Sequence, residues 1–108
     1  YFDCFHDFGN PKKALSYAKQ QVAKEGSLMI VEPKAGDNPE ENFSPIGRLC
    51  YSASTALCVP HSHSQKGDYC LGAQAGPAIT EGIARETGFS YFRIANENIL
   101  NLIYEVKA

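Results

Sequence analysis

The order of short patterns at the start of the chain most constrains its fold. Residues 1–5 are aromatic and Cys-containing and predict the end of a strand. A helix is predicted over residues 11–24, because Asn10 is a capping residue followed by Pro at the first helical position. Gly26 suits the left-handed residue that closes a helix, and the apolar run 28–31 predicts a strand buried on both faces, as in a parallel sheet. A strand, helix and strand in this order imply a parallel pair with a right-handed crossover, so the predicted class is α/β.

The rest of the chain adds helices first and strands last. In the helix over residues 11–24, a narrow apolar stripe predicts one buried face, made of Ala14, Leu15, Ala18 and Val22. The later predicted segments are a loop over 33–42, an amphipathic helix from Ser44 that ends before Pro60, a polar and Gly-rich stretch over 61–76, a helix over 77–86 closed by Gly88, and strands over 89–95 and 99–106 joined by a turn at 96–98.

Composition excludes several classes of function. The chain has 108 residues, 10 Lys and Arg against 12 Asp and Glu, and a formal net charge of -2, which gives no electrostatic reason to expect nucleic acid or an anionic membrane as partner. Its longest apolar run, near residues 28–31, is far shorter than the roughly 20 residues of a membrane span. The four cysteines lack the density of a disulfide-stapled secreted domain, so we expect a cytoplasmic protein. An even count leaves disulfides open, with three pairings for four cysteines.

Two stretches that follow one another along the chain resemble segments of a known protein family. The first is Phe2-Asp3-Cys4-Phe5-His6-Asp7-Phe8, and the second, after the helix, is Gly26-Ser27-Leu28-Met29-Ile30-Val31-Glu32-Pro33. Together with the terminal hairpin and its Leu102-Ile103-Tyr104-Glu105 run, they resemble the second half of class I S-adenosylmethionine-dependent methyltransferases, in particular the small-molecule O-methyltransferases. The resemblance spans nearly the whole chain.

The resemblance implies a Rossmann-like fold, of which residues 1–108 form the C-terminal half. These residues match the end of the fourth strand, the fifth strand, and the antiparallel pair of sixth and seventh strands of a seven-stranded sheet with flanking helices. The first three strands, with the Gly-rich loop that holds the cofactor, have no counterpart, and no G-x-G-x-x-G occurs. We therefore expect a fragment of a longer methyltransferase, inactive alone, that uses S-adenosylmethionine and a small-molecule methyl acceptor.

The same resemblance assigns candidate site residues. His6 matches the general base that takes a proton from the acceptor hydroxyl, a task suited to a side chain with a pKa of about 6.5. Glu32 matches the acid that orients this His. Asp3 and Cys4 lie at the carboxyl end of a strand, where ligands bind in α/β folds, and are the candidate cofactor-binding residues. The alternatives are that His6 only completes the turn after the strand and that Glu32 caps the following loop.

A second group of residues has the chemistry of metal ligands. Cys58, His61, His63 and Cys70 follow the spacing C-x2-H-x-H-x6-C. The spacing is irregular for structural zinc, and the resemblance requires no metal. We therefore expect no metal here, but a buried helix Cys and solvated loop histidines, with the loop forming a lid over the substrate together with Tyr51.

An interaction module is the alternative to an enzyme. A fourth strand without its neighbour presents unpaired N–H and C=O groups, which recruit other strands. In that case the chain forms a homodimer through the exposed sheet edge or its helices and has no catalytic role.

Overall fold

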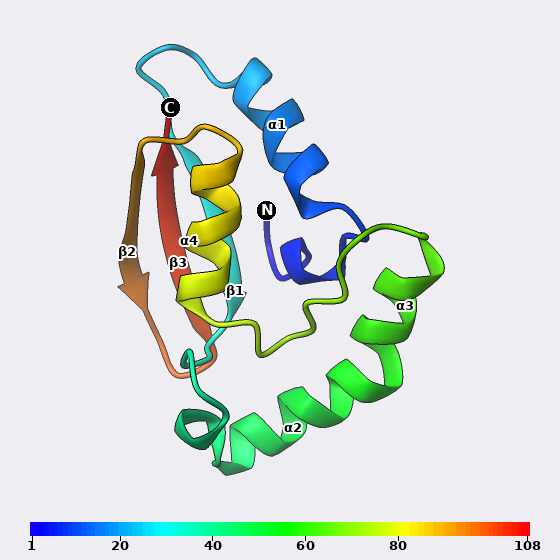
Figure 1. The fold of residues 1–108 in the computed structure, drawn as a ribbon. Coiled ribbons are helices and arrows are strands. Elements are labelled where there is room, and N and C mark those ends of the chain that lie inside the picture. The colour runs from blue at the N-terminus through cyan, green and yellow to red at the C-terminus, as the bar shows by residue number, and fades with distance from the viewer.

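A three-stranded sheet forms one layer of the molecule, and helices pack against one of its faces (Figure 1). The computed structural model describes all residues from 1 to 108. The strands are β1 (Leu28–Pro33), β2 (Tyr91–Glu97) and β3 (Asn101–Lys107). The order in the sheet is β1-β3-β2, and β3 runs antiparallel to both neighbours. The chain is therefore a mixed α/β domain, and β1 and β2 share one direction.

The predicted strand end at the N-terminus exists as a short extended segment beside β1. The Val31 N–H donates to the Tyr1 carbonyl at 2.9 Å, and the Asp3 N–H donates to the Val31 carbonyl at 2.8 Å. Phe2 and Val31 form an isolated parallel bridge. The predicted parallel pairing of the N-terminal segment with β1 is therefore present, but it consists of one bridge only.

The helices start where the sequence places capping residues. Asn10 Oδ1 accepts a hydrogen bond from Lys13 N–H at 2.9 Å, and Ser44 Oγ accepts one from Gly47 N–H at 3.0 Å. The helices are α1 (Pro11–Gln21), α2 (Pro45–Ala53), α3 (Val59–Ser64) and α4 (Pro77–Glu86), with 3₁₀ turns η1 (Phe5–Asp7) and η2 (Pro39–Asn42) and a π-helical turn η3 (Ser54–Cys58). No helix has the length and apolar composition that crossing a bilayer requires.

The hydrophobic core lies between the sheet and the two helices α1 and α4. Alternate residues of β3 supply its sheet side, and Leu15 of α1 and Ile83 of α4 cover it. Its nine buried members are Phe5, Leu15, Ile30, Ile83, Ala84, Phe89, Leu102, Tyr104 and Val106. The core fixes β1 against the turn η1 because both contribute fully buried side chains to it.

The sheet is buried on one face only, which corrects the expectation for residues 28–31. In β1 the buried residues alternate, with Ile30 and Glu32 inside and Met29 exposed. This alternation is typical of an antiparallel sheet with one covered face, and β3 is the antiparallel partner of β1 along its whole length. Continuous apolar runs do not by themselves distinguish one-sided from two-sided burial.

The helix α1 ends three residues before its predicted end. Val22 is extended, with ψ of 132°, and the next three residues are exposed, so a further turn would gain no packing. Leu15 is buried and Ala14 and Ala18 are half-buried, as predicted, whereas Val22 lies beyond the helix. Gly26 does not have the left-handed conformation that was predicted for it. Gly88, predicted to close α4, does have it, with φ of 88°.

The second helix does not end before Pro60, contrary to prediction. The chain continues from α2 through η3 into α3, and Pro60 lies in the first turn of α3. A proline lacks the N–H that an α-helix interior needs, and a π-helical turn directly before it changes the bonding pattern so that the helical path continues. We call this continuous unit, residues 45–64, the helical arm; Figure 1 shows it extending away from the sheet.

The apolar stripe of the helical arm faces solvent over much of its length. Leu49 and Leu57 are each 67% exposed, although their spacing of eight residues places both on the apolar face of the amphipathic helix predicted from Ser44. Amphipathic periodicity predicts which residues share a face but does not supply the surface that covers it.

The terminal hairpin is confirmed with a shift of about two residues. Asn98 Oδ1 accepts hydrogen bonds from the N–H groups of Leu100 and Asn101, each at 2.8 Å, and this places the turn later than predicted. The pairing of β2 with β3 shifts register between Ile94 and Asn96, which marks a bulge near the end of β2.

We expect Leu15→Ala to lower the free energy of unfolding by about 2–5 kcal/mol, because Leu15 is fully buried and its removal leaves a cavity. The matched change Leu57→Ala, at a helical Leu that is 67% exposed, should stay within about 0.5 kcal/mol of the wild type. Urea denaturation followed by circular dichroism measures both. Equal losses would contradict the placement of the core.

Candidate functional site

The candidate site forms where the turn η1 crosses the carboxyl end of β1. The parallel bridge between Phe2 and Val31 sets the register, so that the turn arrives beside Glu32, the next residue of β1. The buried side chain of Phe5 anchors the turn in the hydrophobic core. The strand pairing therefore brings together two residues, His6 and Glu32, that are 26 positions apart in the chain.

Glu32 binds three groups of the turn with its carboxylate. Oε1 accepts a hydrogen bond from Phe5 N–H at 2.8 Å, and Oε2 accepts one from His6 N–H at 3.2 Å. His6 Nδ1 lies 2.5 Å from the same Oε2. Because a carboxylate accepts, Nδ1 carries the proton, and in the neutral ring the lone pair is on Nε2. The predicted contact between His6 and Glu32 is thus present, and it also meets the need to complete the turn.

The pair is closed to solvent. His6 is 4% exposed and Glu32 is 6% exposed. Burial disfavours the charged imidazolium, but the hydrogen bond to Glu32 and the negative charges of Glu32, Asp7 and Asp3 outweigh it, so the pKa of His6 lies above its usual value. A proton on Nε2 is therefore stabilised in this setting.

Two further side chains face His6 from the side opposite Glu32. Asp7 Oδ1 lies 3.4 Å from His6 Nε2, and this oxygen is buried without a hydrogen-bond partner. Cys58, at the end of η3, is also buried. One ligand atom from each of His6, Asp7 and Cys58 lies within 4.8 Å of the other two. Burial, together with the neighbouring Asp7, raises the pKa of the Cys58 thiol.

The helix α3 holds this cluster by binding the backbone that follows η1. Gln65, at the end of α3, donates from Nε2 to the Asp7 carbonyl at 2.8 Å and accepts from Gly9 N–H at 2.9 Å. The fully buried Ser62 hydroxyl lies 3.1 Å from the Phe8 carbonyl. These bonds join the helical arm to the turn and keep Cys58 next to Asp7.

The predicted cofactor residues lie at the edge of this site. Asp3 is exposed and has a positive φ of 46°, an uncommon conformation outside glycine. Its Oδ1 accepts a hydrogen bond from Asn101 Nδ2 at 2.6 Å, and the same amide lies 3.3 Å from the Glu32 carbonyl. Cys4 is half-buried beside it. Asn101 was not predicted, and no local pattern marks it, because its contact with Asp3 spans 98 residues.

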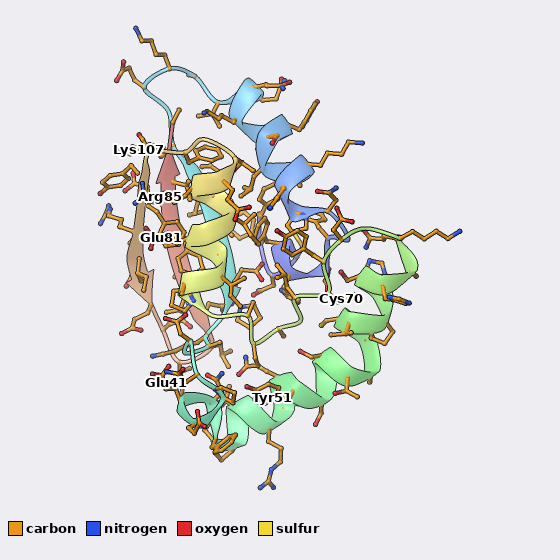
Figure 2. The ribbon with its side chains drawn as sticks, viewed as in Figure 1. Glu41, Tyr51, Cys70, Glu81, Arg85 and Lys107 are labelled. Carbon is orange, nitrogen blue, oxygen red and sulfur yellow. The ribbon has the colours of Figure 1, made fainter.

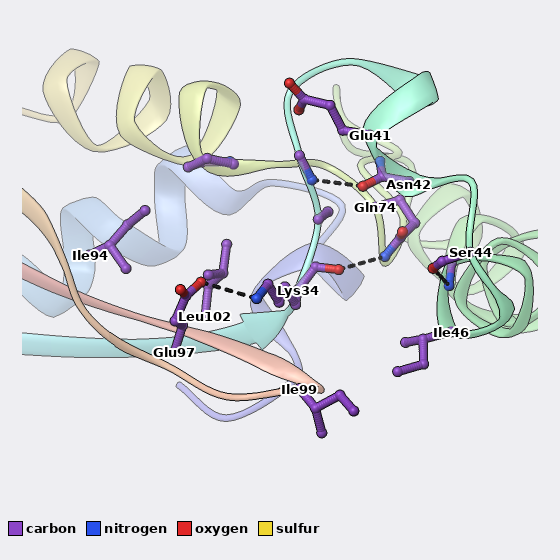
Figure 3. Close-up of a pocket in the computed structure, with 14 residues that line it drawn as sticks. Lys34, Glu41, Asn42, Ser44, Ile46, Gln74, Ile94, Glu97, Ile99 and Leu102 are labelled. Carbon is purple, nitrogen blue, oxygen red and sulfur yellow. Dashed lines mark hydrogen bonds and ion pairs between the residues drawn. The ribbon is translucent and has the colours of Figure 1, made fainter.

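A cavity of about 460 Å³ opens at the same end of the sheet, beyond Pro33 (Figure 3). A Lys34–Glu97 ion pair at 3.2 Å lies on one side of it, and Gly36 N–H donates to Asn42 Oδ1 at 2.7 Å on the other. Its apolar lining comes from Ala35, Ile46, Pro77, Ile94, Ile99 and Leu102. His6 and Glu32 line none of the five cavities of the molecule.

The four residues of the C-x2-H-x-H-x6-C pattern do not meet at one point. Cys58 faces His6 and Asp7 in the interior. Cys70 lies beside α3, where its sulfur is 4.0 Å from His63 Nδ1 on the surface (Figure 2). The expectation of a buried helix Cys is confirmed. The cluster that does form contains Asp7, which the sequence spacing does not connect with Cys58.

Comparisons with known proteins add no family to this geometry. No protein-family model matches the chain, and no curated protein matches it.

We expect Glu32→Gln to lower the pKa of His6, because the neutral amide removes the negative charge and one of the two acceptor oxygens that favour the imidazolium. The raised pKa means that the folded state binds the proton more tightly than the unfolded chain. The stabilisation is therefore complete below about pH 6.5 and is lost as the pH rises through the folded pKa. Imidazole NMR titration in the presence of a chelator gives the pKa, and urea denaturation across this range gives the stability.

The control is His63→Gln, at an exposed ring. It should leave the pH dependence of stability unchanged. An unaltered His6 pKa in Glu32→Gln would contradict the pairing.

Proposed function

We propose that residues 1–108 are the C-terminal part of an S-adenosylmethionine-dependent methyltransferase that transfers a methyl group to a small-molecule acceptor. The observation that carries the proposal is the buried His6–Glu32 pair at the carboxyl end of β1. An imidazole oriented by a carboxylate can take a proton from an acceptor group and hold it as imidazolium.

The strand arrangement supports the same proposal. The last strand, β3, runs opposite to both neighbours, whereas β1, β2 and the N-terminal segment share one direction. The proposed fold has such a reversed last strand. In this assignment the N-terminal segment is the end of its fourth strand, β1 is its fifth, and β2 and β3 are its sixth and seventh.

The chain offers one side of a cofactor site. Asp3 presents an exposed carboxylate next to Cys4 at the strand end where ligands bind in α/β sheets. The hydrogen bond from Asn101 holds Asp3 in its left-handed conformation, so the carboxylate position is fixed before any ligand binds. S-adenosylmethionine supplies an electrophilic methyl group on a sulfonium centre. The other side of the site belongs, in this proposal, to the first three strands of the family fold.

The helical arm serves as the lid of the site. His6 is buried beneath Asp7 and Cys58, so an acceptor reaches Nε2 only when the arm moves. Near the turn the arm is attached through Ser62 and through Gln65, the residue that directly follows it, and much of its outer surface is exposed. Opening of the arm therefore requires local breaking of these bonds, together with those of Ser54 and Tyr51 farther along the arm.

We expect His6→Ala, in the longer protein that contains this chain, to lower turnover by about 10²–10⁴-fold, because the proton acceptor is lost. The affinity for S-adenosylhomocysteine should stay unchanged, since His6 lies outside the proposed cofactor residues. Turnover is measured with a panel of phenols, thiols and amines as acceptors, and affinity by titration calorimetry.

The matched control is His61→Ala, at an exposed His that lines no cavity. It should retain wild-type turnover. Normal turnover in His6→Ala would exclude His6 as the base. If neither the 108-residue chain nor the longer protein binds S-adenosylhomocysteine, the methyltransferase proposal is wrong.

The exposed apolar surfaces favour a second candidate function, a homodimerisation module. Phe2 is 68% exposed at the sheet edge, and Leu49 and Leu57 are each 67% exposed on the helical arm. Apolar side chains gathered on uncovered elements mark association sites when they form a continuous patch.

For this candidate we expect a concentration-dependent dimer of the 108-residue chain in sedimentation equilibrium. The double variant Leu49→Glu and Leu57→Glu should shift it to monomer, because charges would be buried at the interface. The control Glu86→Gln, on α4, should leave the equilibrium unchanged. A monomer at all concentrations would exclude this function.

A further inference from the structure

We propose that His6, Asp7 and Cys58 form a binding site for a divalent transition metal ion, with Zn²⁺ the best match. The three residues come from two parts of the chain, the turn η1 and the end of η3, and meet where His6 and Cys58 are buried and the Asp7 side chain is 30% exposed. The inference goes beyond the proposed function and does not depend on it.

The spacing of the ligand atoms fits a zinc ion. His6 Nε2 and Asp7 Oδ1 are 3.4 Å apart. Two ligands at zinc bond lengths of about 2.0–2.2 Å and a tetrahedral angle lie about 3.3–3.5 Å apart, so this pair needs no rearrangement. The third atom, Cys58 Sγ, completes a set within 4.8 Å and reaches a separation of about 3.6 Å by a modest movement of its side chain.

Glu32 supplies the support that a metal-binding histidine requires. A ligating imidazole usually donates its other ring N–H to a carboxylate, which fixes the ring and its tautomer. His6 Nδ1 lies 2.5 Å from Glu32 Oε2, so the lone pair of Nε2 is directed away from Glu32, towards Asp7. The bond to Glu32 therefore fixes the ring and leaves Nε2 available for coordination.

The buried oxygen of Asp7 also supports a cation at this position. Asp7 Oδ1 is buried and receives no hydrogen bond, although a buried carboxylate oxygen without a partner is costly. A cation between Asp7, His6 and Cys58 would satisfy this oxygen. In the metal-free protein the Cys58 thiol lies within hydrogen-bonding reach of the Asp7 carboxylate, and His6 Nε2, 3.4 Å from Oδ1, can donate to this oxygen when it is protonated.

The donor set selects among cations. One nitrogen, one carboxylate oxygen and one sulfur favour zinc over magnesium or calcium, which prefer oxygen ligands alone. Three protein ligands leave the fourth tetrahedral position for water or a ligand, as in catalytic zinc sites. Metal binding requires loss of the Cys58 thiol proton.

The metal and the proton use the same lone pair. Nε2 of His6 cannot hold an ion and accept a proton from a methyl acceptor at the same time. An occupied site would therefore exclude His6 as the base, and methyl transfer would then depend on the metal-free protein. The test below reads metal binding directly, so the failure of either proposal leaves the other testable.

The experiment titrates the chelator-treated 108-residue chain with Zn²⁺ in competition with a chromophoric chelator. We expect one equivalent of zinc, with affinity at least tenfold weaker in Cys58→Ser and in Asp7→Asn. Glu32→Gln should weaken it by about 10–100-fold through loss of the support to His6. Titration with Co²⁺ should give a thiolate-to-cobalt charge-transfer band that disappears in Cys58→Ser.

The matched controls are Cys70→Ser and His63→Gln, which change the Cys and His pair on the surface. Both should bind zinc as the wild type does. Absence of stoichiometric binding, loss of binding in these controls, or a cobalt complex without a thiolate band would overturn the proposal. Circular dichroism identifies a variant that fails to fold, and the cobalt spectrum of the wild type and of Cys70→Ser still shows whether a thiolate other than that of Cys70 binds the ion.

Discussion

The buried carboxylate of Glu32 is the interaction on which the candidate site depends. An ionised carboxylate inside a protein is tolerated when donors surround it, and here the donors are two backbone N–H groups and one imidazole from the turn η1. The same three bonds fix the turn, orient His6 and set the proton on Nδ1. Glu32 therefore holds the turn and orients His6 with the same bonds. The side chain of Phe5, buried in the core, holds the turn against β1.

The π-helical turn η3 has a comparable role on the other side of His6. It carries the helical path past Pro60, so that α3 reaches the turn η1 and its Gln65 binds Asp7 and Gly9. Cys58, the last residue of η3, thereby lies next to Asp7. Wide helical turns of this kind are frequent at functional sites, because they redirect side chains without ending the helix.

Two large apolar surfaces of the chain are exposed to solvent. One face of the sheet has no helix over it, and the apolar stripe of the helical arm faces solvent. Both surfaces agree with either proposed function, since the remaining strands and helices of a methyltransferase fold or a second copy of the chain would cover them. The cluster of buried His6, Glu32 and Cys58 with half-buried Asp7 is independent of what covers these surfaces, because its contacts are all within the chain.

Local patterns predicted most of the elements, though not the helix α3, because capping residues, apolar periodicity and turn residues act over a few positions. Asn10 and Ser44 start helices as predicted, whereas the contact between His6 and Glu32 was expected from the resemblance to methyltransferases and not from a local pattern. The tertiary structure alone decided which faces are covered, that the arm passes through Pro60, and that Asp7 and Cys58 meet. These outcomes depend on contacts between residues about 50 or more positions apart, and no local sequence rule encodes such distances.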